Sequence, residues 1–176
     1  MTIDEVDRLA REGIAFTDAH SASAVCTPSR YSILTGRYNW RSRLKSHVLG
    51  GYSPSLIEPG RMTVASLLKG KGYKTACVGK WHLGMDWKGL ENATDSSLPK
   101  NYGPPPGVDF AARIGGGPVD HGFEYFYGIS ASLDMPPYVY IENDRVLEPP
   151  DHESGNDDKM AYWRKGPTAP GFKHEE

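Results

Sequence analysis

The sequence predicts an α/β fold, a sheet accompanied by helices. Helix-like patterns are followed by β-prone stretches twice within the first half of the chain, and 176 residues suffice for a domain with a buried core. The formal net charge of -2, from 20 basic and 22 acidic side chains, gives no general attraction for nucleic acid. No apolar run reaches the roughly 20 residues of a membrane span. We therefore expect no nucleic-acid partner and no membrane span.

The first helix-to-strand unit lies at the N-terminus. Residues 1–11 have the apolar spacing of a helix, and Gly13 is suited to stop it. The stretch "IAFTDAHS", residues 14–21, then predicts a strand. A short helix is expected over residues 28–35, because Pro28 suits its first turn and a glycine follows its end.

The second unit has the same order. Thr63 is the expected N-cap of a helix in "VASLLKGKG", residues 64–72, and "YKTACVG", residues 73–79, predicts the strand after it. From 86 to 118 the sequence is rich in Gly, Pro, Asn and Ser, which predicts a long surface excursion.

The last third predicts a hairpin and then a polar tail. "YVYIENDRVLEP" reads as two short strands joined at Asn143-Asp144. We treat residues 1–150 as one domain. Residues 151–176 are expected to be a polar segment without periodicity.

A thiol precedes the helix expected over residues 28–35, in the stretch "CTPSRYSILTGR". Cys26 would lie at the helix N-terminus, where unpaired N–H groups and the helix dipole favour anions. Arg30, four residues on, would bring a permanent positive charge to the same side of the first turn. A small buried cysteine ahead of a surface helix is the blander interpretation of the same pattern.

Polar side chains also occur just after the strand expected over residues 73–79, in the stretch "VGKWHLG". If the backbone stays extended, Lys80 and His82 point to one side while Trp81 turns into the core. Ligands of open α/β sheets bind outside the carboxyl ends of strands, which is where this segment would lie. Taken alone, a Lys-x-His pattern fits a solvated strand end equally well.

Together these stretches resemble the type I sulfatases of the alkaline phosphatase superfamily. "CTPSRYSILTGR" matches every fixed position of the signature Cys-x-Pro-Ser-Arg-x-x-x-x-Thr-Gly-Arg, and "GKWHLG" is similar to the second sulfatase signature. "LAREGIAFTDAHSASAVCTPSR" and "HGFEYFYGI" are similar to the stretches that precede the first signature and follow the second. Two signatures in the right order make this resemblance far more specific than a single glycine-rich motif.

The resemblance implies an alkaline-phosphatase-like mixed sheet, here without its first strand, and hydrolysis of sulfuric esters. Cys26 matches the cysteine that a formylglycine-generating enzyme oxidises to formylglycine, whose hydrated aldehyde is the nucleophile. Arg30 would then hold the diol, Lys80 would contact diol and sulfate, and His82 would orient or deprotonate the diol. In "GFEYFYGISAS", Ser132 aligns with a serine that contacts the substrate.

The resemblance also implies Ca²⁺, bound in the family by paired aspartates of an N-terminal strand and by a downstream Asp-Asn or Asp-His pair. Neither set occurs in the sequence, so Cys26, as formylglycine, is the one metal contact expected here. The resemblance therefore implies that residues 1–150 are part of an N-terminal catalytic domain and that residues 151–176 continue into a missing remainder of the same domain. We interpret the chain as an N-terminal fragment that is inactive alone. The start of the chain has no signal-peptide pattern and indicates no compartment, whereas the family implies the periplasm, the lysosome or the cell exterior.

The expected partners are the formylglycine-generating enzyme and a sulfated small molecule or sulfated glycan. Two alternatives stay open: a phosphonate or phosphate monoesterase of the same superfamily, and a non-catalytic truncated product. Cys77 lies in an apolar stretch and is expected to pack in the core. The basic stretch 36–47 is read as a solvated loop, and "DHESGNDD" as a mobile acidic stretch because it lacks the spacing of a calcium-binding loop.

Overall fold

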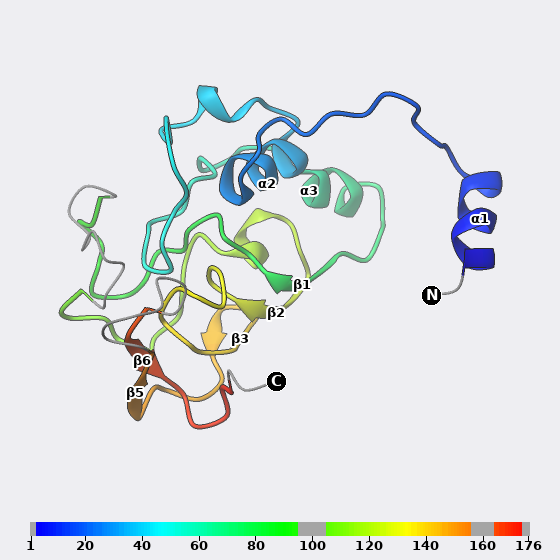
Figure 1. Cartoon of the computed structure of the whole chain (residues 1–176). Helices are drawn as coiled ribbons and strands as arrows, with labels where there is room; N and C mark the ends of the chain where they lie inside the picture. The colour runs from blue at the N-terminus through cyan, green and yellow to red at the C-terminus, as the bar shows by residue number, and fades with distance from the viewer. Residues whose placement is uncertain (1–2, 95–104, 156–163, 174–176) are drawn as a thin grey trace.

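A computed structural model of the chain describes residues 3–94, 105–155 and 164–173. Its central sheet has the order β1-β2-β3-β4. The strands β1 (Ala76–Lys80) and β2 (Tyr125–Ile129) are parallel, whereas β3 (Ile141–Glu142) and β4 (Arg145–Val146) continue the sheet antiparallel. The helices α2 (Cys26–Thr35) and α3 (Val64–Lys69) lie together over one side of this sheet (Figure 1). The expected mixed α/β arrangement is confirmed.

The core lies between the sheet and the segments that cover it. Phe126 of β2 and Ile141 of β3 are fully buried, and they share one cluster with Tyr31 of α2 and with Trp81, which follows β1. Burial of large side chains such as these stabilises a domain by about 1.5–3 kcal/mol each. The core therefore holds α2 and the end of β1 together.

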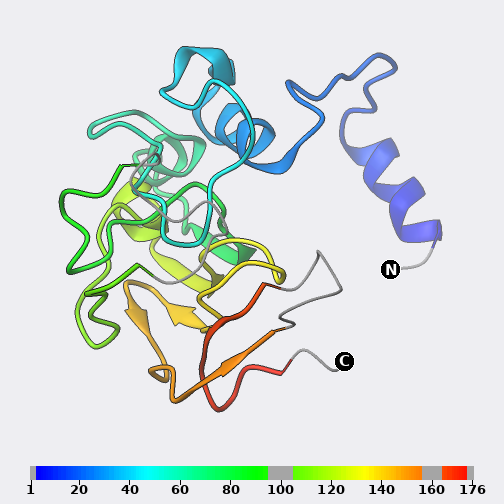
Figure 2. The same ribbon diagram turned by 60° about the vertical axis from the view of Figure 1, so that its left-hand side comes forward.

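The N-terminal helix α1 (Ile3–Glu12) stands apart from the rest of the chain in both ribbon views (Figures 1 and 2). The strand expected over residues 14–21 was wrong, because no strand is found there and Ile14 and Phe16 are 79% and 78% exposed. A β-prone sequence becomes a strand only where a neighbouring backbone completes its hydrogen bonds.

The helix α2 begins at Cys26, two residues before the expected start. Pro28 is therefore its third residue, which costs no hydrogen bond, because the first four N–H groups of a helix have no partner within it. The helix ends as expected at Gly36, whose φ of 64° lies in the left-handed region and whose N–H donates to Ser32 O at 2.9 Å.

The second helix-to-strand unit is confirmed, with shifted ends. Thr63 caps α3 in a capping box, as expected. The helix ends at Lys69 rather than at residue 72, because Gly70 and Gly72 weaken its continuation. The strand β1 runs from Ala76 to Lys80, slightly later than the expected 73–79. The strand therefore ends on the lysine that the second signature supplies.

The stretch 86–118 is anchored in the core. Trp87 and Ile114 are each only 2% exposed, and Trp87 Nε1 donates to Gly51 O at 3.0 Å. Residues 95–104 of this stretch lie outside the described residues. No helix in the described ranges is long and apolar enough to cross a membrane.

The hairpin is confirmed: β3 and β4 are joined at Asn143-Asp144, and Asn143 has a φ of 56°, as a tight turn requires. The polar tail contains two short antiparallel strands that its pattern did not indicate, β5 (His152–Ser154) and β6 (Gly166–Thr168). Residues 156–158 of the acidic stretch lie outside the described residues.

Candidate active site

The polypeptide turns sharply where β1 ends. His82 has a φ of 58°, in the left-handed region, so the expected extended backbone through His82 was wrong. Backbone hydrogen bonds fix the turn against the end of β2 and the residue that follows it: Trp81 N donates to Ile129 O at 3.0 Å, and His82 N donates to Ser130 O at 2.9 Å. Trp81 is buried as expected, but His82 is fully buried too.

Arg30 joins α2 to this turn. Its Nε donates to Trp81 O at 2.8 Å, and its Nη2 donates to Lys80 O. Two donors of one planar guanidinium thus bind consecutive carbonyls at the end of β1, a geometry that lysine cannot reproduce. The side chain of Arg30 therefore places a positive charge beside the carboxyl end of the strand.

Thr27 makes a second link between the same two elements. Its hydroxyl donates to His82 O at 3.0 Å and accepts from Leu49 N at 3.3 Å, and Thr27 itself is fully buried. Cys26 precedes it as the first residue of α2, is partly exposed and carries a free thiol. The expected position of Cys26 at a helix N-terminus is confirmed.

The imidazole of His82 has one satisfied and one unsatisfied nitrogen. Nε2 lies 2.6 Å from Leu49 O, so Nε2 carries the proton and donates it. Nδ1 is then an acceptor, and it is buried without a hydrogen-bond partner among the described residues. Burial, followed by the charges of Lys80 and Arg30, lowers the pKa of His82 to about 4. The ring is therefore neutral at pH 7.

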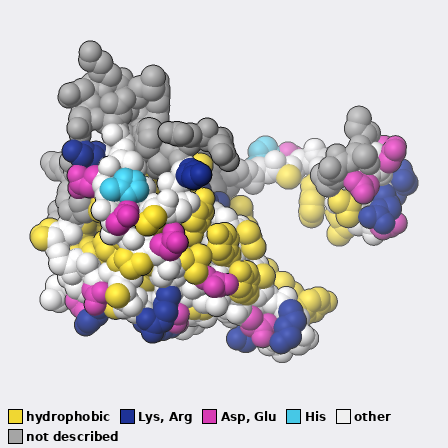
Figure 3. Space-filling model, turned by 90° about the horizontal axis from the view of Figure 1, so that it is seen from below, with side chains coloured by type: hydrophobic (Ala, Val, Ile, Leu, Met, Phe, Trp, Pro, Cys, Tyr) yellow, Lys and Arg dark blue, Asp and Glu magenta, His cyan; other side chains and the backbone are white. Residues whose placement is uncertain are grey.

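Lys80 and Ser132 face each other across the ends of β1 and β2. Lys80 Nζ donates to Ser132 Oγ at 2.5 Å. Both line a cavity of about 740 Å³ whose other walls are mostly apolar, formed by Val78, Tyr127, Ile129, Leu133 and Tyr140. Hydrophobic side chains also gather on the side of the molecule seen from below (Figure 3).

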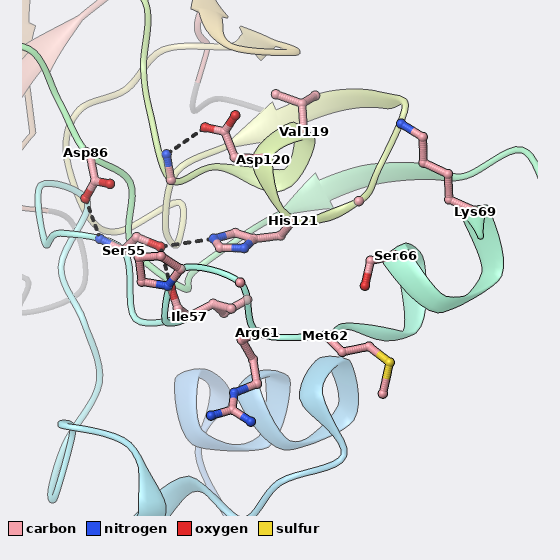
Figure 4. Close-up of a pocket in the computed structure, with 14 residues that line it drawn as sticks. Ser55, Ile57, Arg61, Met62, Ser66, Lys69, Asp86, Val119, Asp120 and His121 are labelled. Atoms are coloured by element: carbon pink, nitrogen blue, oxygen red, sulfur yellow. Dashed lines mark hydrogen bonds between the residues drawn. The ribbon is translucent and has the colours of Figure 1, made fainter.

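A second cavity, of about 900 Å³, lies between α3 and the 3-10 turn η2 (Pro118–His121) (Figure 4). There Ser55 Oγ lies 3.2 Å from His121 Nε2, and Ser55 N donates to Asp86 Oδ1 at 2.9 Å. Because these polar groups bind one another, they connect the segments around the cavity and call for no ligand.

The structure brings together four of the five residues that the sequence singled out. Arg30, Lys80 and His82 meet at the end of β1, and Ser132 joins them through Lys80. Cys26 is connected to them through its neighbour Thr27, a role that the sequence did not indicate because the signature leaves that position variable. Cys77 packs partly buried against the core, as expected, and burial raises the pKa of its thiol.

The described residues do not supply a metal site by themselves. No group of three or more His, Cys, Asp or Glu side chains in these ranges is arranged to hold a metal ion. Calcium usually takes six to eight oxygen ligands. These residues would therefore need further oxygen ligands to hold calcium.

A family model described as Sulfatase matches residues 1–164. The chain belongs to the sulfatase family. It is 37% identical over 94% of its length to an N-acetylgalactosamine-6-O-sulfatase of Bacteroides thetaiotaomicron, and 40% identical over 70% to a mouse steryl-sulfatase. It spans 29% and 17% of the length of these two curated relatives.

Solved structures agree with this family. A structure from a study of glycosaminoglycan metabolism by Bacteroides thetaiotaomicron superimposes with a TM-score of 0.62 at 35% identity, covering 86% of this chain and 30% of that one. The crystal structure of Ps i-CgsB, at 20% identity and a TM-score of 0.54, covers 82% of this chain and 31% of its own and supports the fold alone. The expected sulfatase family and alkaline-phosphatase-like fold are confirmed.

Proposed function

We propose that this sulfatase chain supplies the nucleophile and the sulfate contacts of a site that hydrolyses sulfate esters, with Cys26 converted to formylglycine. The observation that supports this most is Nδ1 of buried His82, which has no hydrogen-bond partner among the described residues. The backbone carbonyl of His82 accepts a hydrogen bond from the hydroxyl of Thr27, the residue after Cys26. A buried acceptor without a partner costs about 1–3 kcal/mol, which a hydroxyl donor at this position would recover.

The formylglycine, as its hydrate, would supply one hydroxyl as the nucleophile and a second hydroxyl that loses its proton, so that the aldehyde re-forms as the bond from its carbon to the sulfate oxygen breaks. A thiol is a weak hydrogen-bond donor, whereas a diol hydroxyl is a strong one that suits His82 Nδ1. Since His82 is neutral at pH 7, it can accept that proton as the hydroxyl attacks. Arg30 and the N-terminus of α2, which has no acidic residue in its first turn, favour the negative charge that develops there.

Lys80 and Ser132 are the proposed sulfate contacts. An ammonium 2.5 Å from a hydroxyl offers two donors to neighbouring oxygens of one tetrahedral anion. In the same proposal, calcium would be held by Cys26, as formylglycine, together with ligands outside the described residues.

For the substrate, we propose a sulfated carbohydrate ahead of other sulfate esters. The match to the N-acetylgalactosamine-6-O-sulfatase covers 94% of this chain, whereas the match to the mouse steryl-sulfatase covers 70%. The proposed partner in maturation is a formylglycine-generating enzyme, and the proposed location is the periplasm, the lysosome or the cell exterior.

Maturation provides the first test. The chain is expressed with and without a formylglycine-generating enzyme, and its peptides are analysed by mass spectrometry. We expect the Cys26 peptide to show the mass difference between thiol and aldehyde only with the enzyme. Cys77 is the matched control, since this free thiol lies outside the signature and should stay unchanged. An unmodified Cys26, beside a converted control sulfatase, would contradict the proposal.

A phosphate or phosphonate monoesterase is the second candidate, because Arg30 and Lys80 suit any tetrahedral anion. The two are separated by assaying the whole sulfatase domain that contains these residues with an aryl sulfate and with the matching aryl phosphate. We expect faster turnover of the sulfate, abolished by Cys26→Ala. Faster turnover of the phosphate would favour the monoesterase.

A further inference from the structure

A carboxylate stands beside the proposed sulfate contacts. Asp134 follows Ser132 by two residues, and both line the same cavity as Lys80. A backbone hydrogen bond from Met135 N to Ser132 O, 3.0 Å long, closes a turn over these residues. A carboxylate that shares a cavity with an ammonium can form an ion pair with it, and such a pair would compete with an anionic substrate for Lys80.

Arg164 engages that carboxylate instead. Its Nη1 lies 2.5 Å from Asp134 Oδ2 and 3.2 Å from Asp134 O, and its backbone N donates to the same carbonyl at 3.3 Å. The carbonyl of Arg164 accepts from Tyr138 Oη at 2.5 Å. Arg164 is thus fixed to the turn through its backbone and through its side chain.

We infer that the Asp134–Arg164 ion pair is a positioning device that withholds Asp134 from Lys80 and so keeps the Lys80 ammonium available for sulfate. Among the described residues, the hydrogen-bond partner of the Lys80 ammonium is then the neutral hydroxyl of Ser132, which sulfate oxygens can join or replace. This inference rests on the proposed function, because it assumes that Lys80 contacts sulfate.

The charges at the end of β1 agree with this arrangement. Burial lowers the pKa of His82 most and the charges of Lys80 and Arg30 lower it further, whereas the hydrogen bond to Leu49 O and, to a smaller extent, the charge of Asp134 raise it. The negative charge of Asp134 therefore acts on the same imidazole as the positive charges of Lys80 and Arg30. An arginine that holds this carboxylate preserves the positive character that an anion needs, while the carboxylate still offsets part of the charge when no anion is bound.

The test measures how fast the Lys80 amine is reductively methylated in the folded chain, by peptide mass spectrometry, with increasing inorganic sulfate as the probe. In Arg164→Gln, Asp134 is free to pair with Lys80. We expect methylation of Lys80 to become about threefold slower. The sulfate concentration that protects Lys80 should also rise about threefold, because an exposed ion pair contributes a free energy that corresponds to a factor of about this size. Adding Asp134→Asn to Arg164→Gln should restore both values, and Arg164→Lys should stay near the wild type.

Lys165→Gln is the matched control, because it removes the neighbouring charge and leaves Asp134 untouched; Lys165 pairs with Glu153 at 3.6 Å. Equal Lys80 rates in Arg164→Gln and wild type would overturn the inference, and so would a slow rate that Asp134→Asn does not restore. A slow rate in Lys165→Gln would also overturn it, as a general charge effect. Wild-type Lys80 that sulfate does not protect would instead contradict the proposed sulfate contact, whatever the variants show.

Discussion

Acid should destabilise this chain through His82 before most of its carboxylates are protonated. The imidazole is fully buried, donates from Nε2 to Leu49 O, and lies near the positive charges of Lys80 and Arg30. Protonating Nδ1 would place a third positive charge in this buried position without a partner. The perturbation is a fall in pH from 7 to 5, and its effect follows from the two pKa values of His82.

The pKa of His82 is about 4 in the folded chain, against about 6.5 in the unfolded one. Below pH 6.5 the unfolded chain binds a proton that the folded chain does not, so stability falls as the pH falls towards 4. At pH 5 the loss amounts to about 2 kcal/mol, and near pH 4 and below it levels off at about 3 kcal/mol. Burial also lowers the pKa of His121, which adds a loss of the same sign.

Two measurements check this. Nuclear magnetic resonance of the histidine ring protons should show that His82, assigned by its absence in His82→Gln, does not titrate between pH 7 and pH 5. Urea unfolding at both pH values should show that His82→Gln loses about 2 kcal/mol less stability than the wild type over this range. Gln can still donate to Leu49 O, and His121 titrates in both proteins. A His82 midpoint near 6.5, or equal losses in the two proteins, would refute the reasoning.

Three further predictions concern stability, each measured by urea unfolding at pH 7. Thr63→Ala removes the capping box of α3 and should cost about 1–2 kcal/mol; an unchanged midpoint would show that the cap is dispensable. Gly128→Ala would place a Cβ 1.8 Å from Gly79 O and should cost about 3 kcal/mol, whereas Gly115→Ala, with ordinary contacts at 3.6 Å, should cost far less. Asn143→Ala puts a side chain at a φ of 56° and should cost about 1–2 kcal/mol, with Asn143→Gly milder, and the reverse order would contradict the turn argument.

The sequence predicted best what local chemistry decides. The N-cap at Thr63, the helix stop at Gly36 and the turn at Asn143 follow from single residues and their neighbours, and each is found. The two signatures likewise placed Cys26 at a helix start and Lys80 at a strand end.

What depends on distant contacts could not be predicted. Hydrogen bonds to the end of β2 and to Ser130 hold the left-handed backbone at His82, so the extended backbone that was expected to point Lys80 and His82 to one side is not found. Residues 14–21 would form a strand only beside a neighbouring strand that completes their backbone hydrogen bonds, and their own sequence does not show whether such a neighbour is present. The contact between Arg164 and Asp134 joins two segments whose spacing carries no recognisable pattern.

The burial of the signature helix sets an order of events for maturation. Thr27 and Pro28 are buried, Tyr31 is inaccessible, and Arg30 is occupied by two carbonyls at the end of β1. An enzyme that recognises Cys26 by reading the side chains after it finds them already engaged once the helix has packed. If Cys26 is oxidised as proposed, the oxidation would fall in the interval between synthesis and folding, and chains that fold first would keep their thiol. The fraction of converted protein then reports how fast this region folds relative to how fast the modifying enzyme acts.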